Sequence, residues 1–289
     1  MQSVSTQDGR TLCVHEEGDP NGLPVLMHHG TPASGLLYEP HAELAREQGI
    51  RLLGYDRPGY GGSSRHEGRS VSDAASDATA IADALGLERY CSWGISGGGP
   101  HALACAALCD ERLAAVASLA AVAPYASEGL EFLEGMGEEN HVEFGKALEG
   151  EAALRPYLQH ETEAMLGASP DDLVAVMATL LGDEDRAVLT GAFAEFMLRS
   201  DAYALESGVD GWLDDDLAFL RPWGFDLGAI GRPTLLLHGD DDRFVPVSHG
   251  RWLAARIPGV EARIGAGDGH LTLVERRMRE VNDWLLARS

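Results

Sequence analysis

Short apolar segments alternate with helical patterns along most of this chain, and the alternation limits the folds that it can adopt. The apolar segments have the length of buried strands and are residues 24–29, 50–55, 90–95, 114–122, 234–238 and 260–264. Helical spacing of apolar residues occurs at residues 36–48, 71–85, 100–109 and 273–286. Strands and helices that alternate in this way form a parallel sheet with helices on both faces. The sequence therefore predicts an α/β fold with a mostly parallel central sheet flanked by helices.

One long segment interrupts the alternation. Residues 126–230 contain no strand-like apolar run, whereas residues 171–181 and 185–198 within them have the apolar spacing of helices. We therefore expect a core domain of residues 1–125 and 231–289, with an all-helical cap domain of residues 126–230 inserted into it.

The charge of the chain argues against two classes of partner. With 46 acidic and 22 basic residues its formal net charge is −24, and most of the excess lies in residues 126–228. A field of this sign repels nucleic acid and anionic membrane surfaces. Residues 1–10 are too polar for a signal peptide, and no apolar run approaches the ~18 residues of a membrane-spanning helix. We expect a cytoplasmic protein that binds neither nucleic acid nor membranes.

The strongest functional signal is the segment Gly94–Gly98 (GISGG), which has the pattern G-x-S-x-G. It lies between the strand-like run 90–93 and the helical pattern 100–109, so Ser96 falls in a strand-to-helix turn. A serine in such a turn presents its hydroxyl away from the backbone, and a helix N-terminus beside it favours developing negative charge. A glycine-rich turn without catalysis produces the same pattern, but this context favours Ser96 as a nucleophile.

A serine nucleophile needs a base, and the base needs a carboxylate to orient it. Among the 11 histidines the best candidate is His270, in a glycine-rich loop between the last predicted strand and the last predicted helix. Such loops at the carboxyl ends of parallel strands are where this kind of fold places its chemistry. The candidate acids follow Gly239 as three adjacent residues, Asp240, Asp241 and Asp242, and most of them are expected to be solvated.

Acyl transfer also needs hydrogen-bond donors for the oxyanion. One donor is expected from the backbone N–H of Gly97, directly after Ser96. The second is expected from the segment His28–Pro32 (HHGTP), where Gly30 permits a close approach and Thr31 supplies the N–H. The glycine and proline of this segment are also typical of a β-turn, and a β-turn is compatible with Thr31 as an oxyanion donor.

Five segments, in this order, resemble signatures of the α/β-hydrolase family. They are HHGTP (28–32), YDRPGYGGS (55–63), GISGGG (94–99), HGDDDRFVP (238–246) and GHLTLVE (269–275). The resemblance covers residues 10–125 and 230–289 and implies an α/β-hydrolase fold with a helical cap. The family pattern HG-x-x-D-x-x-VP places the acid on Asp242 and leaves Asp240 as the weaker candidate. The DRPG part of the second segment is expected to shape a loop.

The resemblance implies a serine hydrolase that cleaves a carboxylic ester of a small molecule through an acyl-enzyme. Ser96 would attack, His270 and Asp242 would complete the triad, and the Thr31 and Gly97 N–H groups would bind the oxyanion. This chemistry requires no metal or organic cofactor, and the four cysteines have no metal-ligand spacing. The sequence does not indicate an oligomeric state.

Other activities stay open. The acidic cap suits an aminopeptidase or amidase with a cationic substrate, although SWGISGG (92–98) differs from the longer GGSWGS of proteins that resemble proline iminopeptidase. Proteins that resemble cofactor-free haloperoxidases, or perhydrolases, use the same triad to form peracids. Epoxide hydrolases and haloalkane dehalogenases of this fold use an aspartate nucleophile, so Ser96 argues against both. A ligand-binding receptor of the same fold is the non-enzymatic alternative.

Overall fold

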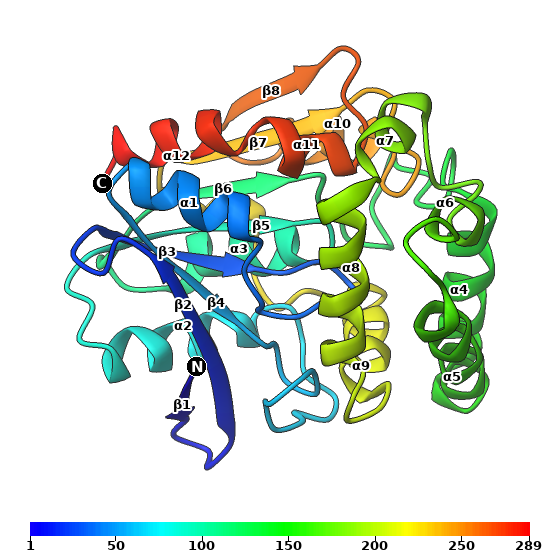
Figure 1. Ribbon diagram of the computed structural model, residues 1–289. Helices are drawn as coiled ribbons and strands as arrows, with labels where there is room; N and C mark the ends of the chain where they lie inside the picture. The colour runs from blue at the N-terminus through cyan, green and yellow to red at the C-terminus, as the bar shows by residue number, and fades with distance from the viewer.

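The computed structural model describes all 289 residues and is built around one eight-stranded sheet (Figure 1). The strands lie in the order β1-β2-β4-β3-β5-β6-β7-β8. β2 is antiparallel to β1 and β4, and the strands from β4 to β8 in this order are parallel. Their bounds are β1 (Gln2–Ser5), β2 (Thr11–Gly18), β3 (Leu23–His28), β4 (Ile50–Tyr55), β5 (Tyr90–Ile95), β6 (Leu113–Leu119), β7 (Thr234–Gly239) and β8 (Glu261–Gly265). The predicted mostly parallel sheet is confirmed.

Helices cover both faces of this sheet (Figure 1). The helices of the core are α1 (Glu39–Glu47), α2 (Asp73–Ala84), α3 (Gly98–Leu108), α10 (Val247–Ala254), α11 (Leu271–Arg276) and α12 (Met278–Leu286). Alternate strand residues point to opposite faces. Leu26 therefore packs in one apolar cluster with residues of α2 and α3, and Val25 packs in the other with Trp284 of α12. Burial on both faces explains why the parallel strands read as continuous apolar runs.

The predicted bounds differ from the structure at a few places. β4 and β5 match their predictions, whereas β6 ends at Leu119 because Ala120 has a φ of 46°, outside the strand region. The hairpin of β1 and β2 was not predicted, since β1 is mostly exposed and β2 ends in charged residues. The helix predicted at 273–286 is divided into α11 and α12 at Arg277.

Six α-helices and one 3-10 helix lie between β6 and β7, and no strand occurs there. In Figure 1 these α-helices gather beyond the end to which β6 and β7 point. They are α4 (Glu138–Glu149), α5 (Glu151–Gly167), α6 (Leu173–Val176), α7 (Asp183–Val188), α8 (Gly191–Ala204) and α9 (Asp210–Phe219), followed by η1 (Leu227–Ala229). The assignment of residues 126–230 to a separate cap domain stays a prediction. We use "cap" below for this segment.

Two helices predicted in the cap were wrong in extent. The prediction at 171–181 forms only the single turn α6, and the prediction at 185–198 is divided into α7 and α8. The division falls before Gly191, whose φ of 52° interrupts the helical path. No helix of the structure combines the length and the apolar character needed to cross a membrane.

Candidate active site

Ser96 occupies a tight turn between β5 and α3. Its φ is 55°, a strained conformation for a residue with a side chain. Two backbone hydrogen bonds stabilise this strained conformation. Ser96 N–H donates to Leu119 O and Gly99 N–H donates to Ser96 O, each at 2.9 Å. Gly94 is required here, since a Cβ at this position would collide with the carbonyl oxygen of Gly98. The strand-turn-helix context predicted for Ser96 is present.

Asp242 and His270 are brought together from the ends of two loops. His270 Nδ1 lies 2.8 Å from Asp242 Oδ2, and Asp242 Oδ1 accepts the backbone N–H of Val245 at 2.8 Å. Both residues are buried, and the Phe244 ring stacks on the imidazole at 4.6 Å between centroids. Burial alone would lower the pKa of His270, but the charge of Asp242 and its hydrogen bond outweigh that effect and raise it.

The three adjacent aspartates have separate environments. Asp240 is exposed, and its Oδ1 accepts the N–H of Gly267 at 2.8 Å. Asp241 lies 3.7 Å from Arg243 in an ion pair at the surface. Among the three, Asp242 is the carboxylate that contacts His270. The assignment that the family pattern implies is therefore the one with suitable geometry.

The two predicted oxyanion donors lie against each other. A Cβ on Gly97 would collide with Thr31 and with the Phe219 ring, so only glycine allows Thr31 to approach so closely. Neither the Thr31 N–H nor the Gly97 N–H donates a hydrogen bond within the protein. Both N–H groups therefore lack an acceptor within the protein, and their role as oxyanion donors stays a prediction.

Ser96 and His270 both line a cavity of about 260 Å³ between the sheet and the cap, and Thr31 lines it too. Most of the remaining lining residues are apolar. No direct hydrogen bond joins the Ser96 hydroxyl to the imidazole, whose Nδ1 is engaged by Asp242. Catalytic hydrogen bonds are often long before a substrate binds. The structure places all five predicted site residues in one region, and their catalytic roles stay predictions.

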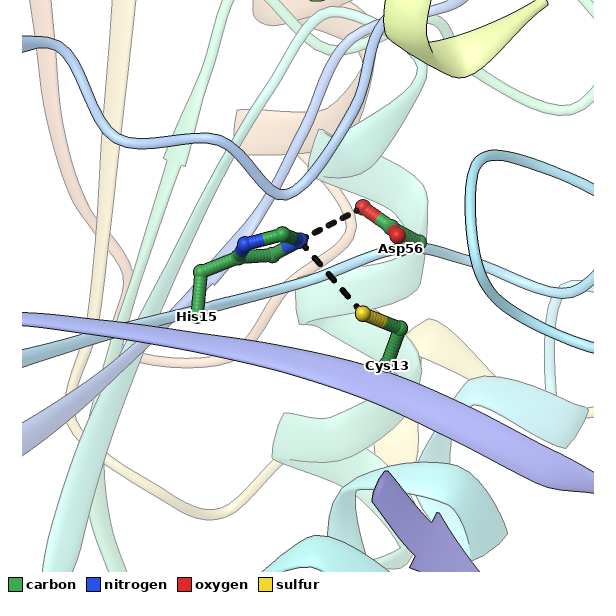
Figure 2. A group of neighbouring side chains, drawn as sticks. All are labelled: Cys13, His15 and Asp56. Atoms are coloured by element: carbon green, nitrogen blue, oxygen red, sulfur yellow. Dashed lines mark hydrogen bonds and ion pairs between the residues drawn. The ribbon is translucent and has the colours of Figure 1, made fainter. Parts of the chain in front are cut away.

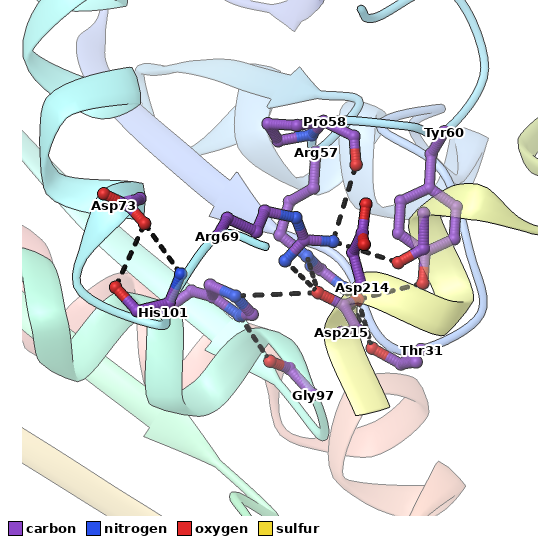
Figure 3. A network of polar contacts seen from close by, with 12 residues as sticks. Thr31, Arg57, Pro58, Tyr60, Arg69, Asp73, Gly97, His101, Asp214 and Asp215 are labelled. Atoms are coloured by element: carbon purple, nitrogen blue, oxygen red, sulfur yellow. Dashed lines mark hydrogen bonds and ion pairs between the residues drawn. The ribbon is translucent and has the colours of Figure 1, made fainter. Parts of the chain in front are cut away.

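A buried carboxylate from the cap supports the Thr31 loop (Figure 3). Asp215 of α9 accepts hydrogen bonds from the Thr31 hydroxyl at 2.7 Å and from Tyr60 Oη at 2.9 Å. It also pairs with Arg57 at 2.6 Å and with Arg69 at 2.5 Å. Burial would raise the pKa of Asp215, but the two guanidinium groups hold it well below its usual range. Asp215 is therefore ionised.

Arg57 links this carboxylate to the backbone of the oxyanion loop. Its guanidinium donates to the carbonyl oxygens of His29 and Gly30 and to the Thr31 hydroxyl, the last at 3.0 Å. Arg57 belongs to the DRPG segment, which was expected to shape a loop, and it contacts the loop that carries Thr31. Asp215 was not predicted, because no motif in the cap distinguishes it from its neighbours Asp214 and Asp216.

Cys13, His15 and Asp56 form a second buried cluster (Figure 2). None of them lines the Ser96 cavity. His15 Nε2 lies 3.1 Å from Asp56 Oδ1 and 3.8 Å from Cys13 Sγ. These are zinc-ligand types. However, burial raises the pKa of the Cys13 thiol, which disfavours the thiolate that a metal needs.

The same Asp56 is already well supplied with hydrogen bonds. Its Oδ1 accepts the N–H of Gly35 at 2.8 Å, and its Oδ2 accepts the N–H of Gly62 at 3.0 Å and Tyr203 Oη at 3.2 Å. We therefore assign this cluster a structural role. It fastens β2 and the loop after β4 to the helix α8.

Comparisons with known proteins agree with this architecture. The family model described as alpha/beta hydrolase fold matches residues 24–276. The non-heme haloperoxidase of Rhodococcus erythropolis is 28% identical over 251 residues, which cover 86% of this chain and 85% of that protein.

Two solved structures share the fold over nearly the whole chain. Bromoperoxidase from Bacillus anthracis has a TM-score of 0.73 at 24% identity and covers 99% of this chain and 98% of its own. A thermophilic esterase from Thermogutta terrifontis has a TM-score of 0.70 at 23% identity and covers 100% of this chain and 99% of its own. Since the family model spans most of the sequence, the chain belongs to the alpha/beta hydrolase fold family.

Proposed function

We propose that this protein hydrolyses a carboxylic ester of a small molecule through an acyl-enzyme on Ser96. The observation that carries the proposal is the buried contact of 2.8 Å between His270 Nδ1 and Asp242 Oδ2, where His270 lines the same cavity as Ser96. With Nδ1–H donated to the carboxylate, Nε2 of the imidazole is left unprotonated and able to accept the serine proton.

The reaction follows from these positions. Ser96 Oγ attacks the ester carbonyl as His270 takes its proton, and the oxyanion is bound by the N–H groups of Thr31 and Gly97. His270 then returns the proton to the leaving alcohol, and water enters to release the acyl group by the same route. The cavity of about 260 Å³ and its apolar lining suit a small, largely apolar acyl or alcohol group.

Peracid formation is the second candidate, because the Rhodococcus erythropolis relative is named as a haloperoxidase. In this reaction a carboxylic acid acylates Ser96 with loss of water, and hydrogen peroxide takes the acyl group to give the peracid. Bromination of monochlorodimedone in the presence of acetate, bromide and peroxide measures it. Bromination that depends on Ser96 would support this second activity, and its absence alongside ester hydrolysis would exclude it.

Labelling by a fluorophosphonate, read by intact mass and peptide mapping, tests the shared first step. We expect one label on Ser96 in the wild type and none in Ser96→Ala or His270→Ala. A folded wild-type protein that takes up no label would contradict the hydrolase proposal and favour a ligand-binding role for the cavity.

A further inference from the structure

One carboxyl group in the Ser96 cavity has no partner within the protein. Asp201 of α8 lines the cavity and is only 5% exposed. Its carboxylate takes part in no hydrogen bond or ion pair, and burial without any compensating charge raises its pKa to about 8. Buried carboxyl groups are normally paired, because an isolated charge in an apolar site is costly. An unpaired one that faces a cavity therefore points to a ligand.

The rest of the cavity is also acidic. Glu139, Glu143 and Glu161 line it, and no lysine or arginine does. Glu139 is engaged by Thr179, and Glu143 accepts Trp212 Nε1–H at 2.9 Å, so these two have partners that Asp201 lacks.

The histidines of the cavity do not balance these acids. Burial lowers the pKa of His41 to about 4, and the pKa of His29 is also lowered well below its usual value by burial. Both rings are therefore neutral near pH 7. His270 also lines the cavity and its pKa is raised, but the charge that it carries when protonated is paired with Asp242 at 2.8 Å. No unpaired cationic side chain therefore faces the acids of the cavity.

The helix α8 presents its carboxyl group at the end of an apolar row. Phe193, Met197 and Asp201 are spaced four residues apart, so they lie on one face of the helix, and all three line the cavity. Aromatic side chains, including Trp212 of α9, line the same space. An alkyl chain along this row would bring a terminal ammonium group to the carboxylate, where aromatic rings also attract a cation.

We propose that Asp201 binds an ammonium group of the substrate, so that the Ser96 cavity selects esters that carry a positive charge on an alkyl chain. The inference rests on the proposed ester hydrolysis and names its substrate class. Glu161 lines the same cavity and adds negative potential to it, which favours entry of a cation.

Pairs of substrates that differ only in charge test the proposal. On the alcohol side, acetylthiocholine is compared with its uncharged carbon isostere, 3,3-dimethylbutyl thioacetate. On the acyl side, the p-nitrophenyl ester of 6-aminohexanoate is compared with that of heptanoate. We expect the wild type to favour the cationic member of at least one pair by about tenfold or more in kcat/KM. Equal kcat/KM values within both pairs would overturn the proposal.

The variant Asp201→Asn keeps the shape of the side chain but cannot ionise when a cation binds. We expect it to bring the cationic-to-neutral ratio of kcat/KM to within about threefold of one, because the ratio cancels any general loss of activity. Glu195→Gln is the matched control, since Glu195 is an exposed acid on the same helix α8 and does not line the cavity. An unchanged ratio in Asp201→Asn, or an equal fall in Glu195→Gln, would assign the preference to the general field of the cap.

Calorimetric titration with hexylammonium and with 1-hexanol separates this inference from the hydrolase proposal. We expect hexylammonium to bind the wild type at least about tenfold more tightly than hexanol, and Asp201→Asn to lose the difference. Ammonium binding without ester hydrolysis would preserve the inference and contradict the proposed function. Ester hydrolysis without any preference for the cation would contradict the inference alone, and tighter binding of hexanol would identify Asp201 as a neutral hydrogen-bond donor.

Discussion

Asp185 Oδ2 accepts the backbone N–H of His270 at 2.8 Å, which ties the candidate base to the cap helix α7. The other oxygen of the same carboxylate accepts the N–H groups of Leu271 at 2.9 Å and Thr272 at 3.1 Å. These are the first residues of α11, whose free N–H groups need acceptors. Gly269 has room only because it lacks a Cβ, which would collide with this carboxylate. Asp185 thus positions His270 through its backbone.

The variant Asp185→Ala is expected to lower kcat by about 10- to 100-fold, with a smaller effect on KM, because misplacing the base costs more than losing a binding contact. It leaves three buried N–H groups without an acceptor, which should also reduce the free energy of unfolding by about 2–4 kcal/mol. Steady-state kinetics and urea denaturation measure the two effects. Asp183→Ala is the control, since Asp183 begins the same helix and is exposed. Loss of stability with full kcat would reduce Asp185 to a purely structural residue.

The pair of Asp242 and His270 determines the pH dependence of the reaction. His270 acts as a base only when it is neutral, so kcat/KM is expected to fall as the pH drops through its pKa. That pKa is raised above its ordinary value by Asp242. In Asp242→Asn the raising effect is lost while burial continues to lower the pKa, so the acid limb should move to lower pH.

The same variant should lose about 10⁴-fold in kcat, by analogy with a triad whose aspartate is neutralised. Steady-state kinetics of ester hydrolysis as a function of pH measure both effects. Asp240→Asn is the matched control, since Asp240 is exposed and hydrogen-bonds a loop N–H away from the imidazole. A pH profile that shifts in Asp240→Asn and stays unchanged in Asp242→Asn would show that Asp240, and not Asp242, is the acid.

The predicted site residues share a physical feature that makes them readable from sequence. Ser96, Asp242 and His270 each follow a strand that is part of the parallel sheet, and local glycines and apolar runs mark those junctions. β4 and β5 match their predicted bounds for the same reason, since both are buried strands between polar or glycine-rich turns.

The contacts from the cap could not be predicted in this way. Asp185 and His270 are 85 residues apart in the chain, and Asp215 and Arg57 are 158 apart. Nothing in the local sequence of either aspartate marks a long-range partner, because acidic residues are common throughout the cap. The breaks between α7 and α8 and between α11 and α12 were also missed, since the apolar spacing continues across both. These long-range contacts and helix breaks depend on burial and pairing that exist only in the folded chain.

A substitution at Gly97 tests whether the backbone N–H groups of Gly97 and Thr31 bind the oxyanion. Gly97→Ala introduces a Cβ against Thr31 and the Phe219 ring, which must move apart. We expect kcat to fall by about 10²- to 10³-fold, the range found when one oxyanion donor is lost. Ester hydrolysis and thermal unfolding are measured together. Gly145→Ala on α4 is the control, because a Cβ there meets no neighbouring atom. Normal kcat in a folded Gly97→Ala protein would remove Gly97 and Thr31 from the mechanism.

Asp215 compensates the charge of two buried guanidinium groups, so its loss should lower the free energy of unfolding. Asp215→Asn leaves Arg57 and Arg69, which are 1% and 3% exposed, without their shared carboxylate. Breaking a buried ion pair by removing one partner costs about 3–5 kcal/mol of unfolding free energy. The Thr31 hydroxyl loses an acceptor in the same change, so kcat should fall as well. Urea denaturation at neutral pH measures the stability, and Asp171→Asn is the control because Asp171 is an exposed acid of the cap.

The stability effect of Asp215 has a defined pH dependence. Because the folded state holds the pKa of Asp215 well below its usual range, the stability that it contributes is present above the ordinary aspartate pKa of about 3.9. That contribution is lost as the pH falls toward the lowered pKa of the folded state. The difference in unfolding free energy between wild type and Asp215→Asn should therefore be constant from pH 5 to 7 and shrink below about pH 4. A difference that grows on acidification would mean that the carboxyl group is protonated in the folded protein and that its hydrogen bonds, not its charge, hold Arg57 in place.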